Sequence, residues 1–325
     1  MSRRSPGQAL VTGAAGFAGQ WLCRDLARHG WHVTGTSLEA PPESGILSDE
    51  DRSAITWIRQ DLRHAAALPL ALATSKPDAI FHLAGVSHVP AAGLDAMHTC
   101  SVNTGVAVRL LETVGERRAA GAIDPVVLVI GSGEQYGRHE TIAMPLGEEA
   151  ECRPSSLYAA TKLAQEVFAL EAYRADGTRV ICTRSFNHSG RGQAEQFLLP
   201  SLVARALRIK AGSAASLEVG NTDSVRDFLH VEDAVRAYVR LVEDGIPGEV
   251  YNVCSGEGVT VGDLAAEVLR AVGVAAELAP TAVLRRRSDV PILIGRNRKL
   301  CVDTGWKSRH TRLDIISDLI DAASH

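Results

Sequence analysis

A glycine-rich turn between an apolar run and a helical pattern constrains the fold more than any other feature of this sequence. Residues 12–19 read Thr-Gly-Ala-Ala-Gly-Phe-Ala-Gly. Gly13 permits a sharp turn, Gly16 lets the backbone approach a pyrophosphate, and Gly19 allows a helix to pack closely on a sheet. The helix N-terminus would offer unpaired N–H groups and a positive dipole end to the phosphates. The turn therefore predicts a dinucleotide site at the start of a Rossmann-type fold.

Short apolar runs alternate with longer helical patterns through the first half of the chain. Strands are expected over 9–12, 32–36, 55–60, 79–83, 126–130 and 179–184, with helices over 16–29 and centred near Ala71, Leu110 and Ala164. Parallel neighbours need a crossover connection, so strands separated by helices predict an α/β fold with a doubly wound parallel sheet.

The order becomes less regular beyond Phe186, which predicts a second part of the chain. Expected there are strands over 216–219 and 250–253 and helices over 262–272 and 313–323. We therefore expect a Rossmann domain over 1–185, with segments near 222–245 returning to it. Residues 186–325 would mainly form a smaller C-terminal α/β lobe that binds substrate.

The composition is that of an ordinary globular protein. Of 325 residues, 46% are hydrophobic and 22% charged, and the net charge of −4 leaves no basic footprint for nucleic acid. No apolar run approaches the length of a membrane span. The six cysteines are scattered, without CxxC pairs or metal-like spacing to histidine, which predicts buried thiols in a reducing compartment, the cytoplasm, and no metal site.

The end of the second expected strand should decide which nicotinamide cofactor is bound. Folds that prefer NAD place an acidic residue there for the ribose hydroxyls. Residues 33–37 carry no carboxylate, and Thr36 and Ser37 could donate to a 2′-phosphate. These residues favour NADP(H). No arginine follows directly, so NAD(H) remains the alternative.

Tyr158 and Lys162 form the candidate catalytic pair. They stand four residues apart at the start of a helical pattern, so both can project from one helix face. A free tyrosine has a pKa of about 10, and a lysine cation nearby would favour the phenolate. The same spacing also occurs at the start of ordinary amphipathic helices, so by itself it does not identify a site.

Ser132 makes the pair more specific. It follows the expected strand 126–130, at the carboxyl end where parallel sheets place ligands, and precedes Tyr158 in the chain. Its hydroxyl can hydrogen-bond a substrate oxygen as charge develops. The order of glycine turn, Ser132, Tyr158 and Lys162 predicts hydride transfer. Glu134 could assist an elimination as a base, or could simply be held by neighbouring backbone N–H groups.

The glycine spacing and these three residues resemble the extended short-chain dehydrogenases/reductases. The resemblance extends to an Asp-containing turn near the adenine and to a loop beside the cofactor. The residues that it and the preceding arguments place at the cofactor are Gly13, Gly16, Phe17, Gly19, Thr36, Ser37, Asp61, Leu62, Leu83, Ala84, Gly85, Tyr158 and Lys162.

The second half of the chain carries narrower motifs. Residues 184–192 resemble the Arg-x-Phe-Asn-His-x-Gly-x-Gly segment of nucleotide-sugar enzymes, 219–228 a segment whose arginine pairs with a diphosphate, and 284–295 an Arg-Pro-Ser-Glu-Val-Pro segment near GDP, from which Arg287 departs. The implied substrate residues are Ser87, Asn187, Arg191, Arg226, Arg286 and Asp289. An alternative for the adjacent arginines at 285–287 is a solvated basic patch.

Together these segments resemble the GDP-6-deoxy-4-keto-D-mannose reductases, which form GDP-D-rhamnose and are close to the GDP-mannose 4,6-dehydratases. The resemblance implies NADPH-dependent reduction of the C4 ketone of a GDP-linked 4-keto-6-deoxy sugar by a homodimer or higher homo-oligomer. The alternatives are a 4,6-dehydratase that uses Glu134, another nucleotide-sugar epimerase or dehydratase, and a redox-sensing binding protein without turnover.

Overall fold

The computed structural model describes residues 7–39, 45–87, 92–281, 284 and 290–323. Its centre is a seven-stranded sheet in the order β10-β6-β5-β4-β1-β2-β3, in which every neighbouring pair is parallel. The strands are β1 (Gln8–Thr12), β2 (His32–Ser37), β3 (Ile55–Arg59), β4 (Ala79–His82), β5 (Val126–Ile130), β6 (Val180–Ser185) and β10 (Val250–Val253). The six strands expected in the first half are confirmed, with ends that differ by at most one residue.

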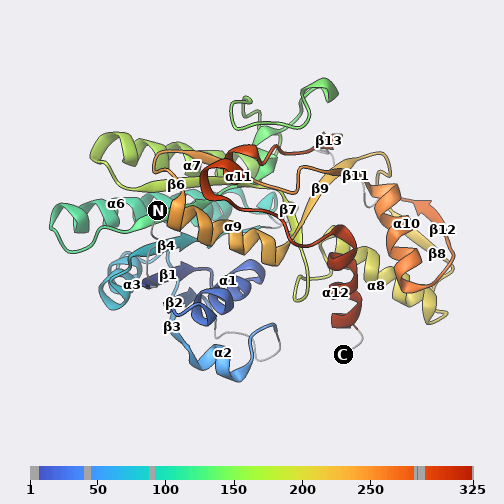
Figure 1. The fold of residues 1–325 in the computed structure, drawn as a ribbon, viewed down its shortest axis with the longest axis horizontal. Helices are drawn as coiled ribbons and strands as arrows, with labels where there is room; N and C mark the ends of the chain where they lie inside the picture. The colour runs from blue at the N-terminus through green and yellow to red at the C-terminus, as the bar shows by residue number, and fades with distance from the viewer. Residues whose placement is uncertain (1–6, 40–44, 88–91, 282–283, 285–289, 324–325) are drawn as a thin grey trace.

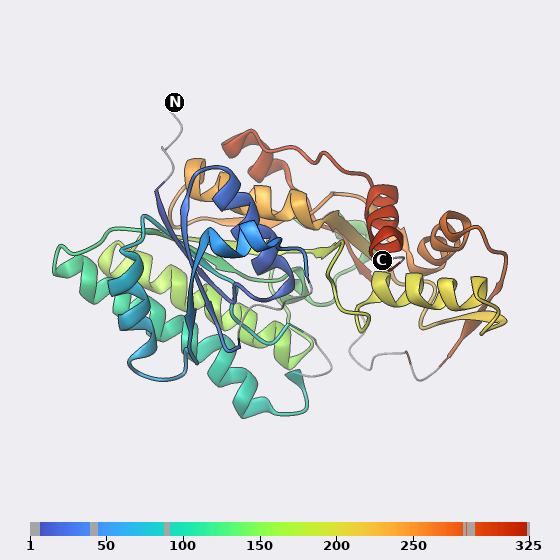
Figure 2. The same ribbon diagram turned by 90° about the horizontal axis from the view of Figure 1, so that it is seen from below.

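Helices cover both faces of this sheet, so its central strands are apolar on both sides. One face carries α1 (Phe17–Arg28) and α9 (Val231–Asp244), which pack on each other, and the other carries α3 (Ala67–Ser75), α6 (Val106–Ala119) and α7 (Leu157–Asp176) (Figures 1 and 2). The expected helices around Ala71, Leu110 and Ala164 are therefore confirmed. The doubly wound α/β fold class is confirmed with them.

A smaller group of elements lies beside the carboxyl ends of the main strands. The strand β9 (Val225–His230) pairs with β7 (Asn187–Ser189), β11 (Gly258–Thr260) and β13 (Ile292–Leu293), and β8 (Ser216–Val219) pairs with β12 (Glu277–Pro280). Helices α8 (Leu198–Lys210), α10 (Val261–Val272) and α12 (Arg312–Ala323) share a separate apolar core with these strands. Figure 1 shows this group at one end of the molecule.

The chain crosses between the two groups differently from the sequence-based expectation. Within 222–245, β9 joins the small sheet and only α9 returns to the main one. The strand β10 also returns, as the seventh strand beside β6, and α11 (Arg298–Thr304) packs on α9 and β10. The sequence of residues 250–253 predicts a strand, but it contains nothing that specifies with which strand it pairs.

The remaining described elements are short. They are α2 (Asp49–Ser53), α5 (Ala96–Cys100), the π-helical turn η1 (Ser101–Gly105) and the 3₁₀ turns η2 (Gly133–Tyr136) and η3 (Thr141–Ala143). Across the described residues, no helix has the length and apolar content of a membrane span. All six cysteines are free. Only Cys23, Cys182 and Cys254 are buried, so the expectation of buried thiols is wrong for Cys100, Cys152 and Cys301, which are partly exposed.

Candidate active site

A cleft of about 1720 Å³ runs along the carboxyl ends of the main strands and continues beneath the small lobe. Its lining includes the glycine turn, the end of β5, the start of α7 and residues of α8 and β9. Pockets for one drug-sized ligand are commonly about 300–1,000 Å³. The cleft therefore has room for a dinucleotide and a second large ligand.

The glycine turn has the geometry that its sequence predicts. Gly13 has a φ of +69°, and a Cβ there would lie 2.9 Å from the Ala84 backbone; a Cβ on Gly19 would overlap the Gly13 carbonyl oxygen. Gly16 is the N-cap of α1, and no side chain caps this helix end. The free N–H groups at the mouth of the cleft fit a dinucleotide pyrophosphate.

The residues at and just after the end of β2 include Glu39, which the sequence analysis did not identify. The hydroxyl of Thr36 is buried and finds no hydrogen-bond partner among the described residues, while the Ser37 hydroxyl donates to the Glu39 carbonyl at 2.5 Å. Ser37 therefore already uses the proton that was expected to bind a 2′-phosphate. Glu39 lines the same end of the cleft and brings a carboxylate two residues beyond the segment 33–37.

The loops after β3 and β4 border the same cleft. The Asp61 carboxylate accepts hydrogen bonds from the Arg63 guanidinium, and these bonds lower the pKa of Asp61 to about 2. Asp61, Leu62, Leu83, Ala84, Gly85 and Ser87 all line the cleft. Buried Asn103, in the π-helical turn η1, fixes the second loop by accepting the Val86 N–H at 2.7 Å.

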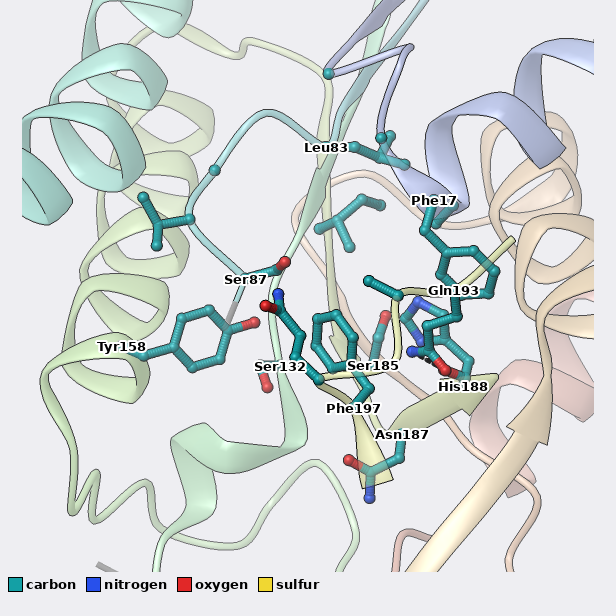
Figure 3. Close-up of a pocket in the computed structure, with 18 of the residues that line it drawn as sticks. Phe17, Leu83, Ser87, Ser132, Tyr158, Ser185, Asn187, His188, Gln193 and Phe197 are labelled. Atoms are coloured by element: carbon teal, nitrogen blue, oxygen red, sulfur yellow. Dashed lines mark hydrogen bonds between the residues drawn. The ribbon is translucent and has the colours of Figure 1, made fainter. Parts of the chain in front are cut away.

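Ser132 and Tyr158 meet in the middle of the cleft (Figure 3). Burial raises the pKa of the Tyr158 phenol to about 12, a hydrogen bond with the Ser132 side chain lowers it, and the charge of Glu134 raises it again. The expectation that Lys162 draws this phenol toward phenolate is therefore wrong for the structure described, because desolvation outweighs the other influences. At neutral pH, Tyr158 is a protonated donor.

Lys162 lies one turn further along α7 and is buried. Its ammonium donates to the Ile130 carbonyl at 2.8 Å, and burial lowers its pKa to about 8. The ammonium also lies near Gly85, where an added Cβ would be 3.6 Å from Nζ. The cation therefore stands between the end of β5 and the loop after β4, where the ribose of a nicotinamide cofactor would fit.

Glu134 follows Ser132 by two residues and also lines the cleft. Its backbone N–H donates to the Ser132 hydroxyl at 3.2 Å. Its carboxylate is close enough to influence Tyr158 electrostatically. The site therefore brings an acid together with the hydroxyls of Ser132 and Tyr158.

The residues expected on the substrate side are only partly brought together. Asn187 and Arg226 line the cleft, and the Asn187 amide donates to the Asp227 carbonyl at 3.3 Å. Arg191 is not among the lining residues; its backbone N–H donates to Asp318, and its carbonyl accepts the Trp21 indole N–H. Arg286 and Asp289 lie outside the described residues.

Several lining residues were not identified from the sequence. His188 stacks on Phe17 across the cleft from Tyr158, with ring centroids 6.1 Å apart (Figure 3). Gln193, Phe197 and Arg205 also line the cleft, the last from helix α8. No helix was expected over α8, and Arg205 was therefore not expected to line the cleft.

One cluster outside the cleft has the composition of a metal site. Ligand atoms of His230, Glu232 and His310 lie within 4.8 Å of one another. The Glu232 N–H donates to Nδ1 of His230, so the proton of this ring is on Nε2, where it faces Asp318 at 3.6 Å. A neutral imidazole cannot accept at one nitrogen and ligate through the protonated other. The cluster is therefore assigned to polar contacts that join the start of α9 to α12 and to the loop before it.

Comparisons with known proteins agree with this arrangement. The sequence profile of the GDP-mannose 4,6 dehydratase family matches residues 10–319. The GDP-6-deoxy-D-mannose reductase of Pseudomonas aeruginosa is 34% identical over 303 residues, which are 93% of this chain and 92% of that protein. The GDP-6-deoxy-D-talose 4-dehydrogenase of Aggregatibacter actinomycetemcomitans is 27% identical, with 94% of each chain covered.

A solved structure of RMD from Pseudomonas aeruginosa complexed with NADPH is also similar. It matches with a TM-score of 0.81 and 32% identity, over 97% of this chain and 98% of that one.

Proposed function

The chain belongs to the GDP-mannose 4,6-dehydratase family of extended short-chain dehydrogenases/reductases, and from this we propose that it reduces the C4 ketone of GDP-4-keto-6-deoxy-D-mannose with NADPH. The product would be a GDP-6-deoxyhexose, with GDP-D-rhamnose favoured. A relative named as a reductase of this sugar class supports the choice, since it covers 93% of the chain.

The position of the Tyr158 phenol, beside Ser132 in the cleft, is the observation that carries the proposal. A ketone reduction needs a hydride at carbon and a proton at oxygen. Tyr158, whose pKa is raised to about 12, keeps its proton at neutral pH and stands beside Ser132 in the cleft. A group of this kind can donate a proton to a developing alkoxide.

The residues would divide the reaction among them. When bound, NADPH supplies the hydride that reaches C4. Tyr158 gives its phenolic proton to O4, and Ser132 hydrogen-bonds the same oxygen while it gains charge. Lys162 holds the nicotinamide ribose through its buried ammonium. The tyrosine must then regain a proton from solvent before the next turnover.

The glycine turn fits NADP(H), whereas the negative charge of Glu39 opposes the 2′-phosphate of this cofactor. The uncapped start of α1 suits the pyrophosphate, and a similar protein has been solved with NADPH. Glu39 would sit near the adenosine ribose, where a carboxylate favours hydroxyls over a 2′-phosphate. NADPH is therefore the proposed cofactor and NADH its competitor.

The substrate would occupy the part of the cleft beneath the small lobe. Ser87, Asn187 and Arg226 are proposed to hold the sugar and its diphosphate, and a guanidinium suits the latter. Residues 1–185 would thus mainly serve the cofactor and 186–325 the GDP-sugar. Arg286 and Asp289 remain proposed contacts of the GDP moiety.

Dehydration of GDP-mannose is the second candidate function. It is favoured by Glu134, whose carboxylate lies in the cleft near Tyr158 and could remove a proton next to a C4 ketone. Such an enzyme would use its cofactor transiently and consume none.

We further propose that the protein is a homodimer located in the cytoplasm. Val167, Phe168 and Tyr173 of α7 are 53%, 42% and 39% exposed, so this helix offers apolar surface for a second copy. The six free thiols suit a reducing compartment.

A substrate comparison tests the proposed reaction. The protein is incubated with NADPH and GDP-mannose, with and without a separate 4,6-dehydratase, and the sugar product is identified by NMR. We expect loss of NADPH only when the dehydratase supplies the ketosugar, one NADPH for each reduced sugar. Formation of ketosugar from GDP-mannose by this protein alone would instead support dehydration, and no turnover in either arm would exclude both.

A further inference from the structure

Three buried polar side chains lie directly behind the catalytic residues, and the proposed reaction does not use them. They are Gln135 in the turn η2, Glu166 in α7 and Arg184 in β6, with exposed fractions of 0%, 5% and 7%. Buried polar and charged groups are costly unless their partners are well placed. Three such side chains in one place therefore imply partners that are held in a defined geometry.

Gln135 connects the catalytic turn to the catalytic helix. Its Oε1 accepts the backbone N–H of Ser132 at 2.8 Å, and its Nε2 donates to Oε2 of Glu166 at 2.8 Å. An amide has one acceptor and one donor end, and here the partners require opposite ends. The side chain therefore has a single orientation in which both bonds form.

Glu166 occupies the same stripe of α7 as the two catalytic residues of that helix. Tyr158, Lys162 and Glu166 follow one another at intervals of four residues, which places them along one helix face. The carboxylate at position 166 thus has a fixed offset from the phenol at position 158. Through Gln135, the same carboxylate is tied to the backbone of Ser132.

Arg184 completes the arrangement from the neighbouring strand. Its guanidinium donates to both oxygens of Glu166, at 2.7 and 3.0 Å, and lies 4.7 Å over the ring of Tyr136. A bidentate pair of this kind fixes the carboxylate in direction as well as charge. Both oxygens of Glu166 are therefore held by Arg184, and Oε2 also accepts the Gln135 amide.

We propose that Gln135 is a positioning residue that sets the distance and angle between Ser132 and Tyr158. The bridge Ser132–Gln135–Glu166 fastens the turn that carries the serine to the helix that carries the tyrosine, and Arg184 locks the far end of this bridge. Its catalytic consequence rests on the proposed carbonyl reduction, since that reaction needs both hydroxyls on one oxygen. A misplacement of about 1 Å can cost on the order of 10²-fold in rate.

Gln135→Leu tests the bridge, with Gln165→Leu as its matched control. Gln165 is also fully buried in this part of α7, but its amide has no hydrogen-bond partner among the described residues. Removing the Gln135 amide should lower kcat by about 10- to 100-fold while the KM values for NADPH and ketosugar change less than about threefold. Gln165→Leu should leave kcat within about twofold. Equal losses of kcat in both variants would overturn the proposal.

Gln135→Glu adds a readout that a purely structural role would not move. Its acid can donate to Glu166 while protonated, but the deprotonated form places two carboxylates together beside one guanidinium. We expect kcat of this variant to approach the wild-type value near pH 5.5 and to fall as the pH rises to 7.5. A kcat whose pH dependence matches that of the wild type would count against the bridge.

Amide exchange at Ser132 separates this inference from the proposed function, because it needs no substrate. In the wild type the Ser132 N–H is held by Gln135, and its exchange should be slow. NMR of the folded variants should show faster exchange at residue 132 in Gln135→Leu and no change there in Gln165→Leu. Unchanged exchange would refute the bridge, whereas a wild-type protein inert toward ketosugar with the expected exchange would refute only the proposed reaction.

Discussion

Lys162 shows at the scale of one residue how burial links catalysis to pH. Burial lowers the pKa of its ammonium to about 8, so protonation is complete only below that pH. Tyr158, with a pKa raised to about 12, stays protonated over the whole working range. As the pH rises, Lys162 therefore loses its proton, and with it its charge, before Tyr158 does.

We predict that kcat/KM for ketosugar reduction falls about tenfold for each pH unit above 8, because the neutral amine no longer stabilises the site. Steady-state rates between pH 6.5 and 9.5 would measure the fall. In Lys162→Arg the guanidinium stays charged over this range. This variant should be less active than the wild type, but its kcat/KM should not fall above pH 8. A wild-type profile that stays level to pH 9.5 would contradict the assignment.

Glu39 makes a second prediction at this scale. Its exposed carboxylate borders the cleft at the end of β2, where it would repel the 2′-phosphate of NADPH. Glu39→Gln should therefore raise the ratio of kcat/KM for NADPH to that for NADH by about three- to tenfold. The exposed Glu116 of α6 offers a control, and Glu116→Gln should leave the ratio unchanged. A shift toward NADH in Glu39→Gln would show that the carboxylate does not face the 2′ position.

Single residues also show what the sequence could and could not predict about the site. The local order of Ser132, Tyr158 and Lys162 predicts that they share a site, because strand ends and helix faces follow from near neighbours in the chain. The direction in which the Tyr158 pKa shifts was predicted wrongly, because this shift depends on burial by distant elements. The same reason explains why Phe197 and Arg205 were missed.

At the scale of elements, the start of α1 separates two roles of glycine. A Cβ on Gly19 would overlap the Gly13 carbonyl oxygen and the Ala14 backbone, whereas on Gly16 its nearest neighbour is that same oxygen at 3.2 Å. Gly19 is thus required by packing inside the protein. Gly16, with an ordinary φ of −71°, is required only by what approaches the helix end.

We predict that Gly19→Ala lowers the free energy of unfolding by about 2 kcal/mol or more, because the backbone must move to admit the methyl group. Gly16→Ala should fold with a loss below about 1 kcal/mol but bind NADPH at least tenfold more weakly. Denaturant titration and calorimetric NADPH binding distinguish the two. Equal stability of both variants, or wild-type NADPH affinity of Gly16→Ala, would be inconsistent with this assignment.

The elements themselves were predicted better than their partners. Each expected strand of the first half occupies the main sheet, since alternating strands and helices leave few ways to form a parallel sheet. Beyond Phe186 the chain crosses between the two lobes, and β10 joins the sheet beside β6. A strand of only four residues fits either sheet, so its partner depends on the finished core.

At the scale of the whole molecule, the exposed apolar surface of α7 predicts association. Phe168→Glu should convert a dimer to a monomer of 34.6 kDa, because a buried unpaired charge at the interface is costly. Leu313 of α12 is 58% exposed on the other lobe, and Leu313→Glu should leave the mass unchanged. Light scattering after size exclusion measures both. A monomeric wild type would exclude the dimer.

In the proposed reaction, the cleft delivers a hydride to C4 of a GDP-linked ketosugar. The most direct measurement uses NADPH deuterated at the nicotinamide carbon that carries the hydride, with GDP-4-keto-6-deoxy-D-mannose as substrate, and locates the label by NMR. We expect one deuterium at C4 of the sugar for each NADPH oxidised. Unlabelled C4, or deuterium at C6 instead, would contradict this expectation.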